Sequence, residues 1–132
     1  MREVLDTRFF VELFSSADSG VLERCRAKMG SLRRSGQGLL PTPVIAEVVH
    51  QACETLGAAA AERHRQALLH SGLRVLPLDA EAAAAAGLLK CGHRRTPFAD
   101  CLVGAMALRA GARITTDDPH FAEFEGLKVT WI

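Results

Sequence analysis

Five acidic residues in this sequence stand beside short apolar segments, where their carboxylates could reach a shared site. They are Asp6, Glu47, Asp100, Asp117 and Asp118. Glu47 and Asp100 have mostly apolar neighbours, so their ionised forms carry a desolvation cost. Two carboxylates about 5 Å apart at an effective dielectric constant of about 20 repel each other by a few kcal/mol. A divalent cation usually neutralises such a cluster, and oxygen ligands favour a hard ion, Mg²⁺ or Mn²⁺.

Each acid taken alone also has an ordinary structural explanation. Asp6 could cap the helix that follows it, Glu47 could be an exposed helical residue, and Asp100 could complement its helix dipole. Asp117 or Asp118 could cap a short helix. These explanations account poorly for all the acids together, because the acids come from four separate segments that a single fold could bring to one edge.

The elements that must position these acids alternate between short strands and helices. Strands are expected at 3–5, 38–41, 73–78, 112–115 and 127–132. Helices are expected at 7–15, 18–34, 42–56, 58–70, 79–90 and 96–110, with a short helical turn from 118. This order predicts a single α/β domain over residues 1–132, with a five-stranded parallel sheet and helices on both faces. In such sheets ligands bind beyond the carboxyl ends of the strands, which is where all five acids fall.

Three polar residues are expected to mark helix starts, two of them directly before a proline. Thr42 and Thr96 each precede a proline and are expected to cap their helices with their hydroxyl groups. Asp79 is expected to cap an alanine-rich helix.

Composition excludes several classes of protein. A formal net charge of +1 over 132 residues is too small for a protein that coats a polyanion, so any contact with nucleic acid must come from the basic clusters at 21–36 and 90–95. The four cysteines form no CxxC pair, which excludes a zinc ribbon and a thioredoxin motif. We expect their thiols to be reduced and buried, in a cytoplasmic protein with no signal peptide and no membrane segment.

Four motifs follow one another along the chain. They are Val4-Leu5-Asp6-Thr7, Thr42-Pro43-Val44-Ile45-Ala46-Glu47, Pro97-Phe98-Ala99-Asp100-Cys101-Leu102-Val103-Gly104-Ala105 and Ile114-Thr115-Thr116-Asp117-Asp118-Pro119-His120-Phe121. In this order they resemble the PIN domain, in the small single-domain form found as VapC toxins of VapBC toxin–antitoxin pairs. The resemblance implies an Mg²⁺- or Mn²⁺-dependent endoribonuclease acting on single-stranded or structured RNA, a cognate antitoxin and a homodimer.

The resemblance also implies the roles of individual residues. Asp6, Glu47, Asp100 and Asp118 correspond to the catalytic, metal-binding carboxylates, and Thr7 and Thr116 to hydroxyl groups that support them. A water beside such an ion loses a proton more readily and attacks the phosphorus in line. His120 is expected at the helix surface, although it could contact a phosphate. His93, Arg94 and Arg95 could help to hold the RNA backbone.

The fourth acidic position is occupied by two adjacent residues. The spacing to Phe121 selects Asp118 as the ligand. The alternative is that Asp118, before Pro119, caps the short helix and leaves Asp117 as the ligand. Because adjacent residues of an extended segment point to opposite sides, we expect one ligand, Asp118, with Asp117 assisting from just outside the ligand set.

Three other interpretations compete with this one. A haloacid dehalogenase-type phosphatase needs Asp-x-Asp after the first strand, but position 8 is Arg8. A receiver domain needs a lysine at the last strand, and Lys128 lies at the wrong end of that segment. A non-catalytic RNA- or antitoxin-binding module of the same fold is the main alternative, and RNA cleavage distinguishes it from the nuclease.

Overall fold

Five short strands form one sheet in the computed structural model, which describes all of residues 1–132. The strands are β1 (Glu3–Leu5), β2 (Gly38–Pro41), β3 (Arg74–Leu76), β4 (Arg113–Thr116) and β5 (Val129–Trp131). Their order across the sheet is β3-β2-β1-β4-β5, and every neighbouring pair is parallel. The predicted α/β fold with a five-stranded parallel sheet is therefore confirmed.

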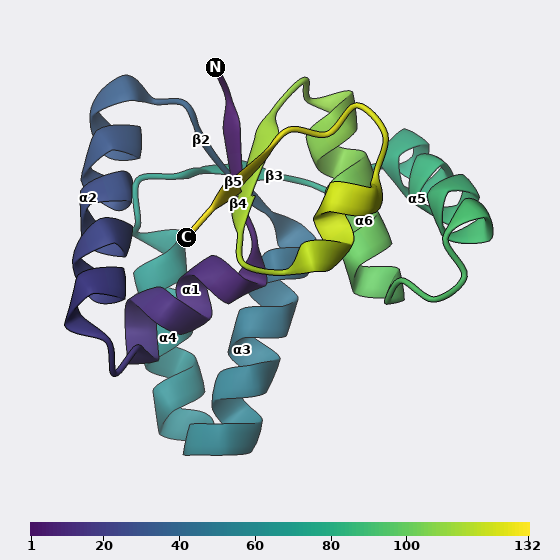
Figure 1. Cartoon of the computed structure of the whole chain (residues 1–132). Coiled ribbons are helices and arrows are strands. Elements are labelled where there is room, and N and C mark those ends of the chain that lie inside the picture. Colours follow the sequence, from purple (N-terminus) through teal and green to yellow (C-terminus); the bar gives the residue numbers. More distant parts are fainter.

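Helices connect the strands and cover both faces of the sheet. They are α1 (Thr7–Ser15), α2 (Ser19–Ser35), α3 (Thr42–Leu56), α4 (Ala58–Leu69), α5 (Ala80–Gly92) and α6 (Phe98–Arg109), followed by the 3-10 helix η1 (Pro119–Glu123). Helix α2 lies on one side of the sheet, whereas α5 and α6 lie on the other (Figure 1). Helices α1, α3 and α4 lie beyond the carboxyl end of β1 (Figure 1).

The central strand holds the functional edge of the sheet in place. All three residues of β1 are buried, as expected for a strand flanked by neighbours and covered on both faces. Directly after it, the Asp6 N–H donates to the Thr115 carbonyl at 3.2 Å, so β1 and β4 stay attached at their carboxyl ends. Phe9 and Phe10 of α1 belong to the same buried hydrophobic cluster as Phe121 and Phe124 from the chain around η1. This packing gives the residues after β1 and β4 a rigid support.

The two threonines expected to cap helices have other partners. Helix α3 begins at Thr42, whose hydroxyl accepts from the Leu78 N–H at 3.1 Å. Helix α6 begins at Phe98, and the Thr96 hydroxyl donates to the Glu123 carboxylate at 3.3 Å. The predicted hydroxyl caps are therefore wrong, because each hydroxyl finds a long-range partner. The predicted Asp79 cap is confirmed, since its side chain accepts from an amide of α5.

Strand limits and cysteine burial also differ from expectation. Strands β3 and β5 are shorter than predicted, because Pro77 ends β3 and a turn at Gly126 delays β5. Only Cys25 and Cys101 are buried, while Cys53 and Cys91 are exposed, and all four thiols are free. No helix combines the length and the apolar character that crossing a membrane requires.

Candidate metal centre

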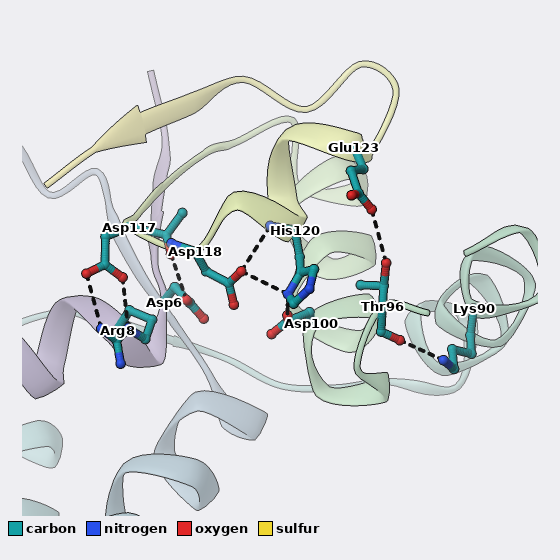
Figure 2. A network of polar contacts seen from close by, with 10 residues as sticks. Asp6, Arg8, Lys90, Thr96, Asp100, Asp117, Asp118, His120 and Glu123 are labelled. Carbon is teal, nitrogen blue, oxygen red and sulfur yellow. Dashed lines mark hydrogen bonds and ion pairs between the residues drawn. The ribbon is translucent and has the colours of Figure 1, made fainter. Parts of the chain in front are cut away.

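Four acids from four segments line one pocket at the carboxyl edge of the sheet. They are Asp6 after β1, Glu47 in the second turn of α3, Asp100 in the first turn of α6 and Asp118 after β4. The pocket has a volume of about 180 Å³. Of these four residues, Figure 2 draws Asp6, Asp100 and Asp118, which face one another from three different elements.

Two threonines orient the acids on the sheet side of the pocket. The Thr116 hydroxyl donates to Asp6 Oδ2 at 2.9 Å, and the Thr7 hydroxyl donates to Glu47 Oε1 at 3.0 Å. Thr116 Oγ1 also accepts from the Asp118 N–H at 2.9 Å. One threonine at the end of β4 therefore holds two of the acids, and the other joins α1 to α3.

His120 completes the cluster on the η1 side. Its Nδ1 lies 3.0 Å from Asp100 Oδ2 and 2.9 Å from Asp118 Oδ1 (Figure 2). Asp118 Oδ1 also accepts from the His120 backbone N–H at 2.9 Å, so Asp118 caps η1 and faces the pocket at once. Ligand atoms of Asp100, Asp118 and His120 all lie within 4.8 Å of one another, a spacing that could hold one metal ion. His120 was expected at the helix surface, and its side chain is 38% exposed, but it also contacts two of the acids.

Asp117 points away from this cluster. Its carboxylate accepts from Arg8 Nε at 2.8 Å and from Arg8 Nη2 at 3.3 Å, and the pair is exposed (Figure 2). The adjacent Asp118 turns inward, as expected for neighbouring residues of an extended segment. Arg8 lines the acidic pocket as well, and its hydrogen bond to Asp117 raises the pKa of its guanidinium.

Burial and mutual repulsion make two of the acids hard to ionise. Burial and the charge of Glu47 together raise the pKa of Asp6 from 3.8 to about 6, against the hydrogen bond from Thr116. Burial and the carboxylates of Asp118 and Asp6 together raise the pKa of Asp100 from 3.8 to about 7, against the hydrogen bond with His120. The raised pKa values mean that nearby positive charge is too small to balance these carboxylates when they are ionised.

The free oxygens of these acids fit a hard divalent cation. Glu47, Asp100 and Asp118 each use one carboxylate oxygen in a hydrogen bond or ion pair with the chain and leave the other without a partner. Asp6 likewise bonds one other side chain, that of Thr116. An all-carboxylate set with one neighbouring imidazole suits Mg²⁺ or Mn²⁺, the ions that oxygen ligands favour.

Comparison with known proteins places this geometry in a family. The sequence model of the PIN domain matches residues 4–127. The chain belongs to the PIN domain family. A search of curated protein sequences gives no match.

Solved structures of PIN proteins share the fold at low sequence identity. VapBC2 of Rickettsia felis, bound to a DNA fragment from its promoter, matches with a TM-score of 0.81 and 15% identity, over 100% of this chain and 99% of that one. VapC20 of Mycobacterium tuberculosis, a toxin that cleaves the sarcin–ricin loop, has a TM-score of 0.68 and 20% identity over 91% and 92% of the chains. FitAcB of Neisseria gonorrhoeae has a TM-score of 0.73 and 21% identity over 96% and 95%.

The residue pattern did not identify every side chain that contacts the acids of this PIN domain. Arg8 appeared only as the residue that excludes a phosphatase motif, and His120 as a surface residue. The sequence did contain a signal for His120. It stands two residues after Asp118, and a residue two positions after a capping aspartate lies on the same tight turn. The signal for Arg8 was weaker, since only the fold brings the first turn of α1 beside Asp117.

Proposed function

We propose that this PIN domain is an Mg²⁺- or Mn²⁺-dependent endoribonuclease and the toxin of a type II toxin–antitoxin pair. One observation carries the proposal: carboxylates from four separate segments meet in one pocket with oxygens left free. Asp6, Glu47, Asp100 and Asp118 would hold the ion. When bound, the ion makes a water a stronger nucleophile and stabilises charge that develops on the phosphate.

The remaining residues around the pocket orient its ligands and attract the substrate. Thr7 and Thr116 fix carboxylate rotamers through the hydrogen bonds given above. Arg8 places a guanidinium at the rim, where it can contact an RNA phosphate. Arg94 and Arg95 are exposed on the loop that leads to Pro97 of the pocket, and they would guide the RNA backbone.

The neighbours support RNA as the substrate and an antitoxin as the partner. One of them is a toxin that cleaves the sarcin–ricin loop, and others are toxin–antitoxin complexes. A basic antitoxin side chain that enters the acidic pocket would compete with the ion and silence the enzyme in the cytoplasm. Strong expression of the protein alone should therefore arrest growth, whereas expression of Asp100→Asn should not. Normal growth with the wild type would remove the toxin part of the proposal.

A homodimer is also part of the proposal. Leu88 on the alanine-rich α5 is 77% exposed, more than any other large apolar side chain. Small residues on α5 would let a second copy approach closely and cover it. Light scattering should give twice the chain mass for the wild type and a smaller mass for Leu88→Asp. A monomeric wild type would contradict this.

The cleavage test uses purified protein and single-stranded RNA. RNA should be cut with Mg²⁺ or Mn²⁺ and spared in excess EDTA. Asp100→Asn should abolish cleavage, whereas Glu125→Gln, which removes an exposed acid outside the pocket, should leave the rate unchanged. Cleavage that resists EDTA and Asp100→Asn alike would refute the proposal. RNA binding without any cleavage would favour the non-catalytic module.

A further inference from the structure

The largest hollow of the molecule lies outside the acidic pocket, between α2 and the end of β5. Its volume is about 570 Å³, which falls within the range of small-molecule sites. Arg24 and Lys28 of α2 stand on one wall, and Thr130 and Trp131 of β5 on the other. In Figure 1 the C-terminal residues end beside α1 and α2.

Thr115, one of the residues that line this hollow, has a buried hydroxyl without a partner. Thr115 of β4 is 2% exposed, and its Oγ1 has no hydrogen-bond partner in the chain. An unsatisfied buried hydroxyl destabilises the fold unless something supplies its hydrogen bond. Thr115 pairs in register with Thr130, so two hydroxyl-bearing residues lie side by side here. Hydroxyl groups can hydrogen-bond with the edge of a polar ring such as a nucleobase.

The rim of the hollow carries a free cation and an exposed aromatic ring. Lys28 Nζ is held by Glu3 Oε1 at 3.1 Å, but Arg24 is exposed and forms no ion pair or side-chain hydrogen bond. Trp131, the only tryptophan of the chain, is 54% exposed. An exposed aromatic ring and an unpaired guanidinium that line one hollow are the combination with which proteins hold single-stranded nucleic acid, by base stacking and phosphate contact.

Adjacent residues connect the hollow to the acidic pocket. Phe9 lines the hollow and Arg8 lines the pocket. Thr115 lines the hollow, while the next residue, Thr116, donates to Asp6. The Ile132 N–H donates to the Thr116 carbonyl, which attaches the far wall of the hollow to the same end of β4. The two sites are therefore lined by neighbouring residues at the start of α1, and both are attached to the carboxyl end of β4.

We propose that the hollow between α2 and β5 binds one unpaired nucleotide of the RNA strand that occupies the acidic pocket. Its base stacks on Trp131 and hydrogen-bonds with the Thr115 hydroxyl, and its phosphate contacts Arg24. This inference rests on the ribonuclease function proposed above, and it adds a site that selects a base next to the cut.

Trp131 reports directly on this site because its fluorescence is the only tryptophan signal of the chain. A short single-stranded oligoribonucleotide is titrated into the full-length Asp100→Asn protein in EDTA, which prevents cleavage. Binding should quench the fluorescence. Adding Arg24→Ala should weaken binding. It should also make the negative slope of log K for RNA binding against log salt concentration shallower by about 0.7, the value for one phosphate contact on a single strand. Arg26→Ala removes the same charge from the same helix outside the hollow and should leave the slope unchanged.

Kinetics of the active enzyme provide the second readout. Trp131→Ala should raise KM for RNA about tenfold with kcat within about twofold of wild type, and Trp131→Phe should restore most of the loss. Thr115→Val keeps the shape of the side chain and should change which base is preferred beside the cut.

Two results would overturn the inference and leave the nuclease standing. One is RNA that is bound and cut with no change in Trp131 fluorescence and with equal effects of Arg24→Ala and Arg26→Ala. The other is quenching by an antitoxin peptide but not by RNA, which would assign the hollow to a protein segment. A protein that neither binds nor cuts RNA would instead refute the proposed function itself, and this inference with it.

Discussion

At the scale of single residues, the two oxygens of each carboxylate have different uses. Thr7 holds one oxygen of Glu47, and His120 holds one oxygen each of Asp100 and Asp118. These contacts fix the side chains in place and leave the second oxygens available to a cation. Asp117 differs because Arg8 engages both of its oxygens.

This difference predicts unequal effects of two neighbouring substitutions. Asp118→Asn should lower Mn²⁺ affinity at least about tenfold and abolish cleavage, because it removes a ligand oxygen. Asp117→Asn should have little effect, since it breaks only an exposed ion pair worth about 0–1 kcal/mol. Asparagine still caps a helix, so neither change should unfold η1. A larger loss of Mn²⁺ affinity in Asp117→Asn, measured by calorimetry, would make Asp117 the ligand.

The raised pKa values predict how stability depends on pH without metal. Because the pKa of Asp6 is about 6 and that of Asp100 about 7 in the fold, against 3.8 for both in the unfolded chain, the native state binds more protons between these values. These two groups therefore lower the free energy of unfolding as pH rises from about 4 to about 7.

Asp100→Asn tests this dependence. In EDTA it should stabilise the protein at about pH 8 by about 1 kcal/mol, after a discount for solvent screening, and much less at about pH 4. Urea denaturation at the two pH values measures the difference. Mn²⁺ should raise the melting temperature of the wild type more than that of the variant. A variant that is destabilised at both pH values would show that Asp100 has a structural role.

Residue types and spacing predicted the acids but not all of their partners. Asp6, Glu47, Asp100 and Asp118 were predictable because each stands at a fixed place after a strand or in the first turns of a helix. The contacts of His120 could not be predicted in this way. The direction of its side chain depends on the short 3-10 helix η1, which is not marked by a periodic pattern of apolar residues. The assignment of Asp118 as a ligand stays a prediction.

At the scale of elements, close packing between α6 and the segment after η1 supports the pocket. Gly104 lies on α6, and a Cβ there would collide with the ring of Phe124. Because this contact holds Asp100 on one side and Asp118 with His120 on the other, added volume should disturb the site as well as the core.

Two alanine substitutions test this packing. Gly104→Ala should lower the free energy of unfolding by about 1–3 kcal/mol, as overpacking does. Gly87→Ala lies in α5 with nothing near its Cβ, and should instead stabilise the protein by up to about 1 kcal/mol. Chemical denaturation measures both. Equal effects of the two substitutions would contradict the close approach of α6 to Phe124.

Local patterns predicted these elements well but not their ends. Apolar runs and capping aspartates give the strands and helices their order, and parallel pairing follows from the alternation. The hydroxyls of Thr42 and Thr96 were misassigned because Leu78 and Glu123 are distant in sequence. Contacts of this range follow from the tertiary structure, and no local pattern contains them.

At the scale of the whole molecule, charge is separated although the total is only +1. The acids gather in one pocket, while exposed arginines lie outside it, Arg24 on α2 and Arg94 and Arg95 on the loop before α6. In the proposed function, these arginines attract RNA without a metal ion, and a neutralising cation then lets a phosphate approach the acids. This arrangement explains why a nearly neutral PIN domain could bind a polyanion at all.

Anomalous diffraction from crystals soaked in Mn²⁺ tests the central claim most directly, because it locates the ion. We predict a peak in the pocket, within coordination distance of carboxylate oxygens from Asp6, Glu47, Asp100 and Asp118, and no peak beside Asp117. The peak should disappear in Asp100→Asn and persist in Glu125→Gln. A pocket that stays empty at a Mn²⁺ concentration that supports RNA cleavage, or an ion bound elsewhere on the chain, would contradict the account.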